Sequence, residues 1–149
     1  MEQRVSLITL GVRDLARATQ FYAALGWHGQ EVESTVFFQA GPMGVALWSR
    51  SALAADAGIA DGEGDDGFGS IAIAHNVRSD AEVDDIVNNA RTAGARVVRE
   101  PGPTFYGGYA AYFRDPDGHL WEIAHNPGFP LGADGALTIP DFAPPGVED

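Results

Sequence analysis

The chain has 149 residues, of which 45% are hydrophobic and 20% charged, a composition typical of a soluble globular protein. It contains no cysteine and no lysine, which excludes disulfides, thiolate nucleophiles, cysteine-ligated metal centres and Schiff-base lysines. The formal net charge of −12 argues against nucleic acid as a partner, because phosphates require a basic surface.

The first 50 residues predict a strand, a helix and further strands. Residues 5–12 alternate small and large apolar side chains, as strands do. Asp14 is placed to cap a helix that runs to about Ala24, because apolar residues recur at helical spacing between them. Gly26 then supplies a left-handed stop. The strands predicted after this helix cover residues 36–39 and 45–48, joined by a tight turn at 41–44.

The second half repeats this order of elements. Residues 70–77 predict a strand, and Ser79 with Glu82 forms a capping box for a helix that Gly94 ends. Further strands are predicted at residues 95–98, 109–113 and 119–125, with a turn at 115–118. A repeated order of elements indicates two copies of one structural unit.

We therefore predict an α+β fold made of two βαβββ modules, at residues 1–50 and 69–127. An acidic linker rich in Gly, Ala and Asp (51–68) joins them, and a Pro-rich C-terminal tail (128–149) follows. These two segments carry nine of the 21 acidic residues, so the acidity indicates a solvated surface. Each sheet has one face without a helix, and the two curved mixed sheets are expected to form a shared cleft for a small ligand.

The segment Tyr112–Ile123, with the sequence YFRDPDGHLWEI, resembles a motif of the glyoxalase/bleomycin-resistance/extradiol-dioxygenase group, the vicinal oxygen chelate (VOC) superfamily. The resemblance covers both modules, and it implies the glyoxalase/bleomycin-resistance-like fold. It also implies a metal site to which each module gives a His or Gln near the start of its first strand and a Glu on its last. Supporting segments are GVRDL (11–15), FY (21–22), LGW (25–27) and FYGGY (105–109).

Carried over to this chain, the four metal positions of the family fall on Leu7, Trp48, Ser70 and Glu122. Only Glu122 is a strong ligand, because leucine and tryptophan have no donor and a serine hydroxyl binds divalent ions poorly. The strand period of two places His125 on the sheet face opposite Glu122, and His75 away from Ser70. We therefore expect no metal and no other cofactor.

The cleft is expected to bind its ligand through side chains of both modules. Glu122 is the candidate catalytic residue, or the group that recognises a donor on the ligand, unless it pairs with an arginine such as Arg50. Trp48 would offer a flat surface for a ring. Phe105 and Tyr106 belong either to a mobile loop or to a turn with aromatic anchors. The predicted ligand-binding residues are Leu7, Thr9, Trp48, Ser70, Ala72, Phe105, Tyr106 and Tyr112.

Three functions are compatible with this pattern. The favoured one is a metal-independent binder of small aromatic or drug-like molecules, similar to the drug-sequestering members of the family and expected to be a homodimer. The second is a glyoxalase-like lyase or isomerase, or a dioxygenase-like enzyme, that uses Glu122 as base or sole acidic ligand. The third is a partner-binding or scaffold protein whose tail covers a sheet or a second subunit. Whether the modules pair within one chain or across a dimer is open.

The expected cellular location of the protein follows from two features that its sequence lacks. It has no apolar run of about 18 residues that could span a membrane. Its first residues do not resemble a signal peptide. We therefore expect a cytoplasmic protein with no membrane partner.

Overall fold

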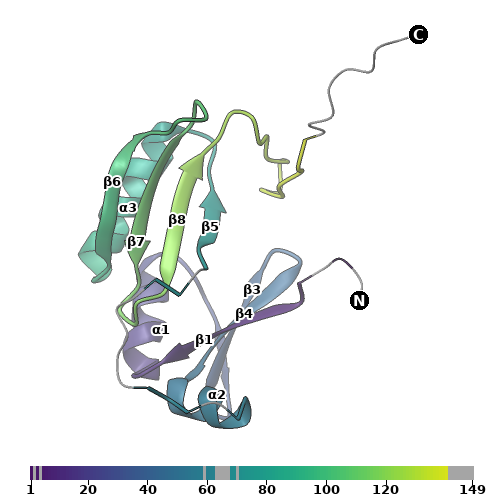
Figure 1. The fold of residues 1–149 in the computed structure, drawn as a ribbon, viewed down its shortest axis with the longest axis vertical. Helices are drawn as coiled ribbons and strands as arrows, with labels where there is room; N and C mark the ends of the chain where they lie inside the picture. Colours follow the sequence, from purple (N-terminus) through teal and green to yellow (C-terminus); the bar gives the residue numbers. More distant parts are fainter. Residues whose placement is uncertain (2, 4, 59, 63–67, 70, 141–149) are drawn as a thin grey trace.

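The computed structural model describes residues 1–140 with the exception of 2, 4, 59, 63–67 and 70. Within these residues, eight strands form two four-stranded sheets, and three helices accompany them (Figure 1). No strand of one described sheet pairs with a strand of the other. The structure thus confirms an α+β fold with two mixed sheets.

The first sheet is built from the N-terminal third of the chain and has the strand order β1-β4-β3-β2. β1 runs parallel to β4, whereas the other two pairs are antiparallel. The elements are β1 (Leu7–Val12), α1 (Leu15–Ala24), β2 (Gln30–Val32), β3 (Thr35–Ala40), β4 (Met43–Ser49) and α2 (Arg50–Asp56). α2 lies in the segment that we expected to be a linker, and it contacts β1 and β4.

The second sheet repeats this topology, with the order β5-β8-β7-β6 and a parallel β5–β8 pair. Its elements are β5 (Ile73–Asn76), α3 (Asp80–Ala93), β6 (Arg96–Pro103), β7 (Tyr109–Arg114) and β8 (Leu120–His125). The strand predicted at 70–77 is thus described over 73–76, and Ser70 lies outside the described residues. The βαβββ pattern includes a strand such as β2, but its position was not predicted, because its three residues are all exposed and show no alternation.

The helix ends follow the predicted chemistry. The Asp14 side chain accepts a hydrogen bond from the Arg17 N–H at the start of α1. At the start of α3 the Ser79 hydroxyl accepts from the Glu82 N–H, whereas the Glu82 carboxylate accepts from the N–H of Arg78 rather than that of Ser79. Gly94 ends α3 with a φ of 108°, in the left-handed region.

Each sheet has a helix face, packed against its helix, and an open face without one. In the first sheet Leu10, Val12 and Leu47 are buried on the helix face, where α1 contacts β3 and β4. In the second sheet Phe113 and Ile123 are buried beneath α3. The strand period of two therefore sorts side chains between the faces as the sequence predicts.

The two modules join through their helix faces. α1 contacts α3, and the apolar core runs without a break from one module to the other. Figure 1 shows α1 beneath the lower ends of β7 and β8, with the two sheets on different sides of it. The sheets are therefore not closed around a shared cleft within one chain, which is one of the two arrangements that the sequence left open. Leu7 and Phe37, on the open face of the first sheet, are 46% and 42% exposed.

Candidate functional site

Glu122 lies in the middle of β8 and points to the open face of the second sheet. Its neighbours Trp121 and Ile123 are buried on the helix face, whereas Glu122 is half-buried. In register beside it are Ala74 of β5 and Tyr112 of β7. Glu122 thus has a small side chain on one side along the sheet and an aromatic side chain on the other.

Glu122 is the centre of a set of polar side chains that we name the Glu122 group: Glu122, Tyr112, Tyr106 and Arg99. Burial, followed by the charge of Glu122 and a hydrogen bond to its carboxylate, raises the pKa of Tyr112. The charge of Tyr106 acts in the same direction on this pKa, whereas the guanidinium of Arg99 lowers it. The Tyr112 hydroxyl therefore stays protonated at neutral pH beside the Glu122 carboxylate.

Arg99 reaches this face because of an irregularity in β6. Val97 pairs with Phe113, which is on the helix face, and strict alternation would put Arg99 on that face too. The register shifts between Val97 and Arg99, so Arg99 pairs with Tyr112 instead. Its guanidinium also donates to the carbonyl of Pro103. The sequence pattern did not predict Arg99, because a bulge reverses the alternation on which that prediction depends.

The loop between β6 and β7 carries Phe105 and Tyr106 as a hydrogen-bonded turn. The Thr104 N–H donates to the Gly108 carbonyl, and the Gly108 N–H donates to the Thr104 hydroxyl. The two rings pack edge to face with centroids 5.2 Å apart. Phe105 is fully exposed and Tyr106 is 42% exposed, so the loop presents a small aromatic surface beside the Glu122 group.

Three of the predicted ligand-binding residues lie together on the open face of the first sheet, away from the Glu122 group. The Leu7 side chain occupies the space that a side chain at position 44 would fill, because residue 44 is glycine. Thr9 is in register with Ala46. Trp48 is partly buried beside Gly11. Phe37, which is in register with Ala46, shares this face. Because Val36 and Phe38 point into the core, the alternation along β3 puts Phe37 on the open face, and this signal could have identified it from the sequence.

Two predicted residues precede β5. Ala72 is exposed and lies outside any strand, and Ser70 is not among the described residues. One chain thus brings together Glu122, Tyr112 and Tyr106, with Phe105 at the edge. It does not bring Leu7, Thr9 or Trp48 to them.

The donor set does not fit the divalent metal that the family resemblance implies. In the described part of the chain, no three His, Asp or Glu side chains are close enough together to bind one ion. Two of the family's metal positions hold Leu7 and Trp48, which have no donor atom. The histidines do not replace them: His75 is in register with Ile123, away from Glu122, and the His125 ring lies 2.7 Å from Asp80.

An arginine partner for Glu122 was the other possibility that we considered. Arg50 pairs with Asp61 at 2.7 Å. Its guanidinium also donates to the Gly62 carbonyl. Asp61 and Gly62 lie in the segment after α2, so the guanidinium of Arg50, at the start of α2, is engaged away from Glu122.

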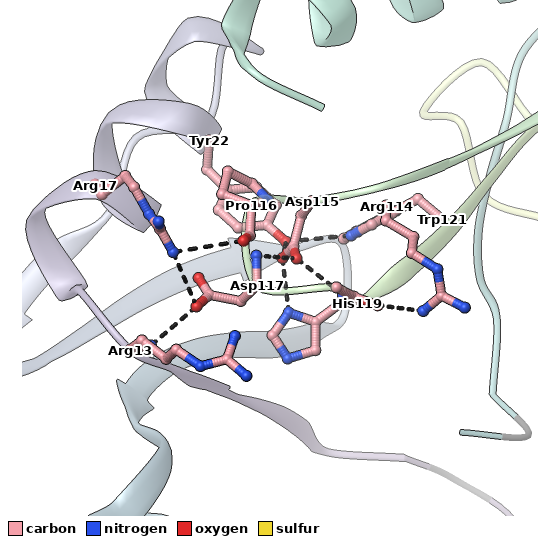
Figure 2. Close-up of polar contacts among 10 residues, drawn as sticks. Arg13, Arg17, Tyr22, Arg114, Asp115, Pro116, Asp117, His119 and Trp121 are labelled. Carbon is pink, nitrogen blue, oxygen red and sulfur yellow. Dashed lines mark hydrogen bonds and ion pairs between the residues drawn. The ribbon is translucent and has the colours of Figure 1, made fainter. Parts of the chain in front are cut away.

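The Asp115–Gly118 turn has a structural role, which Figure 2 shows. The buried Asp115 carboxylate accepts from the Tyr22 hydroxyl at 2.7 Å, lies 2.7 Å from His119 Nδ1, and accepts from two backbone N–H groups of its own turn. Burial alone would raise the pKa of Asp115, but the hydrogen bond and charge of His119, together with the Tyr22 hydroxyl, hold it below its usual value. Asp117 accepts from Arg13 and Arg17, and so fixes the start of α1 to the turn.

Comparison with known proteins identifies the family. The model of the Glyoxalase/Bleomycin resistance protein/Dioxygenase superfamily matches residues 4–123. The chain belongs to this superfamily. The match confirms the resemblance that the two modules and the DPDG motif indicated.

Its relatives in the superfamily include a glyoxalase-related enzyme from Fulvimarina pelagi. That crystal structure has 38% sequence identity to this chain and a TM-score of 0.84, over 92% of this chain and 98% of the other. A "Probable lactoylglutathione lyase" of Vibrio cholerae is 37% identical over 82 residues, 52% of this chain and 54% of that protein. "Lactoylglutathione lyase GLX1" of Arabidopsis thaliana is 43% identical over 58 residues, 38% of this chain and 19% of that protein.

Two further facts about this superfamily member concern its length and its helices. The chain spans about half the length, or less, of the curated relatives that it matches. None of the helices in the described ranges has both the length and the apolar composition needed to cross a membrane.

Proposed function

We propose that this VOC-superfamily protein binds a small aromatic or drug-like molecule on the open face of its second sheet, without a catalytic metal. The observation that carries the proposal is the Glu122 group: the half-buried Glu122 and Tyr112 are in register on the open face of the second sheet, and Arg99 is in register with Tyr112. Glu122 accepts a hydrogen bond or a positive charge from the ligand. Tyr106 and Phe105 supply aromatic surface at its edge.

A second copy of the chain completes this site. Leu7, Thr9 and Trp48 lie on the open face of the first sheet, where Leu7 and Phe37 are exposed and α2 contacts β1 and β4. In a homodimer, the first sheet of one protomer lies over the Glu122 group of its partner. Burying the exposed parts of Leu7 and Phe37 stabilises such a pair by about 1 kcal/mol for each side chain. Trp48 then gives the ligand a flat apolar wall opposite Glu122.

The proposal is tested by replacing the carboxylate. We expect Glu122→Gln to weaken binding of cationic and hydrogen-bond-donating aromatic compounds by about tenfold or more, since hydrogen bonds to a charged group contribute roughly 1.5–3 kcal/mol. Compounds are first selected by thermal shift from a panel of aromatic amines and phenols. Their affinities are then measured by calorimetry with protein dialysed against a chelator.

The matched control is Glu31→Gln, which removes an exposed carboxylate from β2 in the other sheet. We expect it to leave the affinities unchanged. Equal binding by the Glu122→Gln variant and the wild type would disprove the assignment of this residue. A bound divalent metal at one equivalent per chain in the purified protein, measured by plasma mass spectrometry, would disprove the metal-free part.

A second candidate is a glyoxalase-like lyase, and the observation that favours it is the naming of the two curated relatives. Here Glu122 takes a proton from the substrate carbon, while the Tyr112 hydroxyl orients the carboxylate. The assay follows formation of the thioester from methylglyoxal and glutathione, with and without added divalent metal. Turnover that Glu122→Gln abolishes would favour this function over simple binding, and turnover that survives the substitution would exclude it as stated.

A further inference from the structure

A cavity lies on the helix face of the second sheet, between the C-terminal end of α1 and α3. Its volume is about 100 Å³, and its floor is formed by Tyr22, Trp27 and Trp121. Residues of both modules line it, since Tyr22 and Trp27 come from the first module and Trp121 from β8. This cavity is separate from the proposed site. Trp121 and Glu122 are adjacent in β8 and point to opposite faces of the sheet.

In the aromatic floor, Trp27 and Trp121 are packed edge to face, and Tyr22 is tilted against both. The ring centroids of Trp27 and Trp121 are 5.8 Å apart with the planes at 86°, and Tyr22 lies 5.7 Å from Trp27 and 6.1 Å from Trp121. Rings in such clusters present both faces and edges to a further ring, which is a favourable arrangement for aromatic packing. The three rings already contact one another and do not enclose a space between them, so a cation surrounded by ring faces does not fit.

The polar atoms of Tyr22 and Trp121 are used within the protein. The Trp121 indole N–H donates to the Tyr22 hydroxyl, and that hydroxyl donates to Asp115. The inner part of the cavity therefore offers apolar surface, where an apolar group is favoured over water. Polar side chains stand at the opening instead, namely the exposed Asn89 of α3 and His75 of β5.

The size of the cavity limits what it can hold. A closed cavity of ~150 Å³ binds benzene in a well-studied engineered protein. The present cavity is smaller, but it is open to solvent past the exposed residues Ala24 and Asn89. A single ring therefore enters with its polar substituent at the opening, whereas a fused bicyclic compound does not.

We propose that this cavity binds one small uncharged aromatic ring with a hydrogen-bonding substituent, a compound of the phenol class. The ring packs on Trp27 and Trp121, and its substituent meets the Asn89 amide, which can donate and accept. The bound ring contacts both modules. It also contacts β8, the strand that carries Glu122, on the sheet face opposite Glu122.

The test uses the three tryptophans as reporters, because the cavity contains two of them and Trp48 lies on the other sheet. Phenol is titrated into the full-length ¹⁵N-labelled protein, and the three indole N–H signals are followed by NMR. We expect saturable shifts of the Trp27 and Trp121 signals, with the Trp48 signal unchanged. The absence of a saturable shift, or a shift of the Trp48 signal alone, would overturn the proposal.

Two neighbouring alanines at the end of α1 provide a matched pair of variants. Ala24 lines the cavity and Ala23 does not, and both are exposed. We expect Ala24→Phe to fill the opening and weaken phenol binding at least about tenfold, and Ala23→Phe to bind as the wild type does. Asn89→Phe, on the opposite wall, blocks the opening independently in case Ala24→Phe does not fold. Undiminished binding by a folded cavity variant would overturn the proposal.

The substituent is tested with a second matched pair on α3, where Asn89 lines the cavity and the exposed Asn88 does not. We expect Asn89→Ala to weaken binding of phenol but not of toluene, and Asn88→Ala to affect neither. Binding of tetramethylammonium in preference to phenol would overturn the assignment of ligand class, as would tight binding of indole.

Discussion

Asp115 is a single carboxylate that holds together parts of the chain far apart in sequence. It is 4% exposed, and its partners include Tyr22 of α1 and His119 of its own turn. A buried charge that loses a partner becomes costly, because neither water nor another donor replaces it. The DPDG motif that marks the family in the sequence thus acts here as the link between the two modules.

Replacing Asp115 by asparagine removes the charge but keeps the shape of the side chain. We expect Asp115→Asn to lower the free energy of unfolding by about 2–4 kcal/mol, because hydrogen bonds to a charged acceptor are lost in a buried site. Urea denaturation measures this change. Asp56→Asn, at an exposed position in α2, is the control, and we expect it to change stability by less than about 0.5 kcal/mol. A similar effect of both substitutions would contradict this role of Asp115.

The same carboxylate predicts a dependence of stability on pH. The pKa of Asp115 is held below its usual value of 3.8 in the folded protein, so its ionised form favours folding at pH values above 3.8. This contribution is lost as the pH falls below 3.8 toward the folded-state pKa. We expect the difference in unfolding free energy between the wild type and Asp115→Asn to shrink as the pH falls below 3.8. A difference that grows on acidification would contradict this prediction.

At the scale of elements, the end of α3 depends on one backbone conformation. Gly94 has a φ of 108°, and no other atom lies within 4 Å of the place where a Cβ would be. Backbone strain is therefore the whole cost of a side chain there. We expect Gly94→Ala to lower the free energy of unfolding by about 1–2 kcal/mol, measured by urea denaturation.

The control for this prediction is Gly62→Ala. Gly62 also has open space around its Cα but does not lie in the left-handed region. Alanine there restricts mainly the unfolded chain, so we expect stability to be unchanged or slightly higher. Equal losses in both variants would show that the left-handed conformation is not the cause.

Local signals predicted most of these elements, and the failures have physical reasons. Capping at Asp14 and Ser79 and the stop at Gly94 need only neighbouring residues, so the sequence was sufficient for them. β2 is a short exposed strand that exists because β3 is next to it. The bulge that brings Arg99 to the Glu122 group depends on pairing with β7, and alternation within β6 does not reveal it.

The candidate site shows the same difference between features that local sequence determines and features that packing between elements determines. The alternation in β8 correctly predicted that Glu122 faces away from Trp121 and Ile123. It did not predict which sheet faces meet, because that depends on how the modules pack. Phe21 and Tyr22 of α1 pack with Phe113 and Trp121, and this packing turns the open faces away from each other.

At the scale of the whole molecule, the exposed apolar side chains of Leu7 and Phe37 on the open face of the first sheet predict self-association. We expect the wild-type protein to have twice the mass of the 15.7-kDa chain in solution, and Phe37→Glu to have the mass of a single chain. A charge placed on an apolar contact between protomers opposes their association, because it loses its water there. Light scattering coupled to size-exclusion chromatography measures the masses.

Ala23→Glu places the same charge on an exposed position of α1, away from the open faces, and we expect it to leave the dimer intact. A single-chain mass for the wild-type protein at micromolar concentrations would contradict the dimer. Dissociation of the Ala23→Glu variant would instead indicate that α1 forms part of the interface.

The hydrogen bonds of Tyr22 also have a consequence for synthesis on the ribosome. Tyr22 belongs to the first module, but its hydroxyl donates to Asp115 and accepts from Trp121, which come about 90–100 residues later in the chain. Translation proceeds at ~5–20 residues per second. For several seconds α1 is therefore outside the exit tunnel with an apolar face and a polar group that lack their final neighbours. The N-terminal half thus cannot complete its core until nearly the whole protein has been made, although it repeats the architecture of the half that follows.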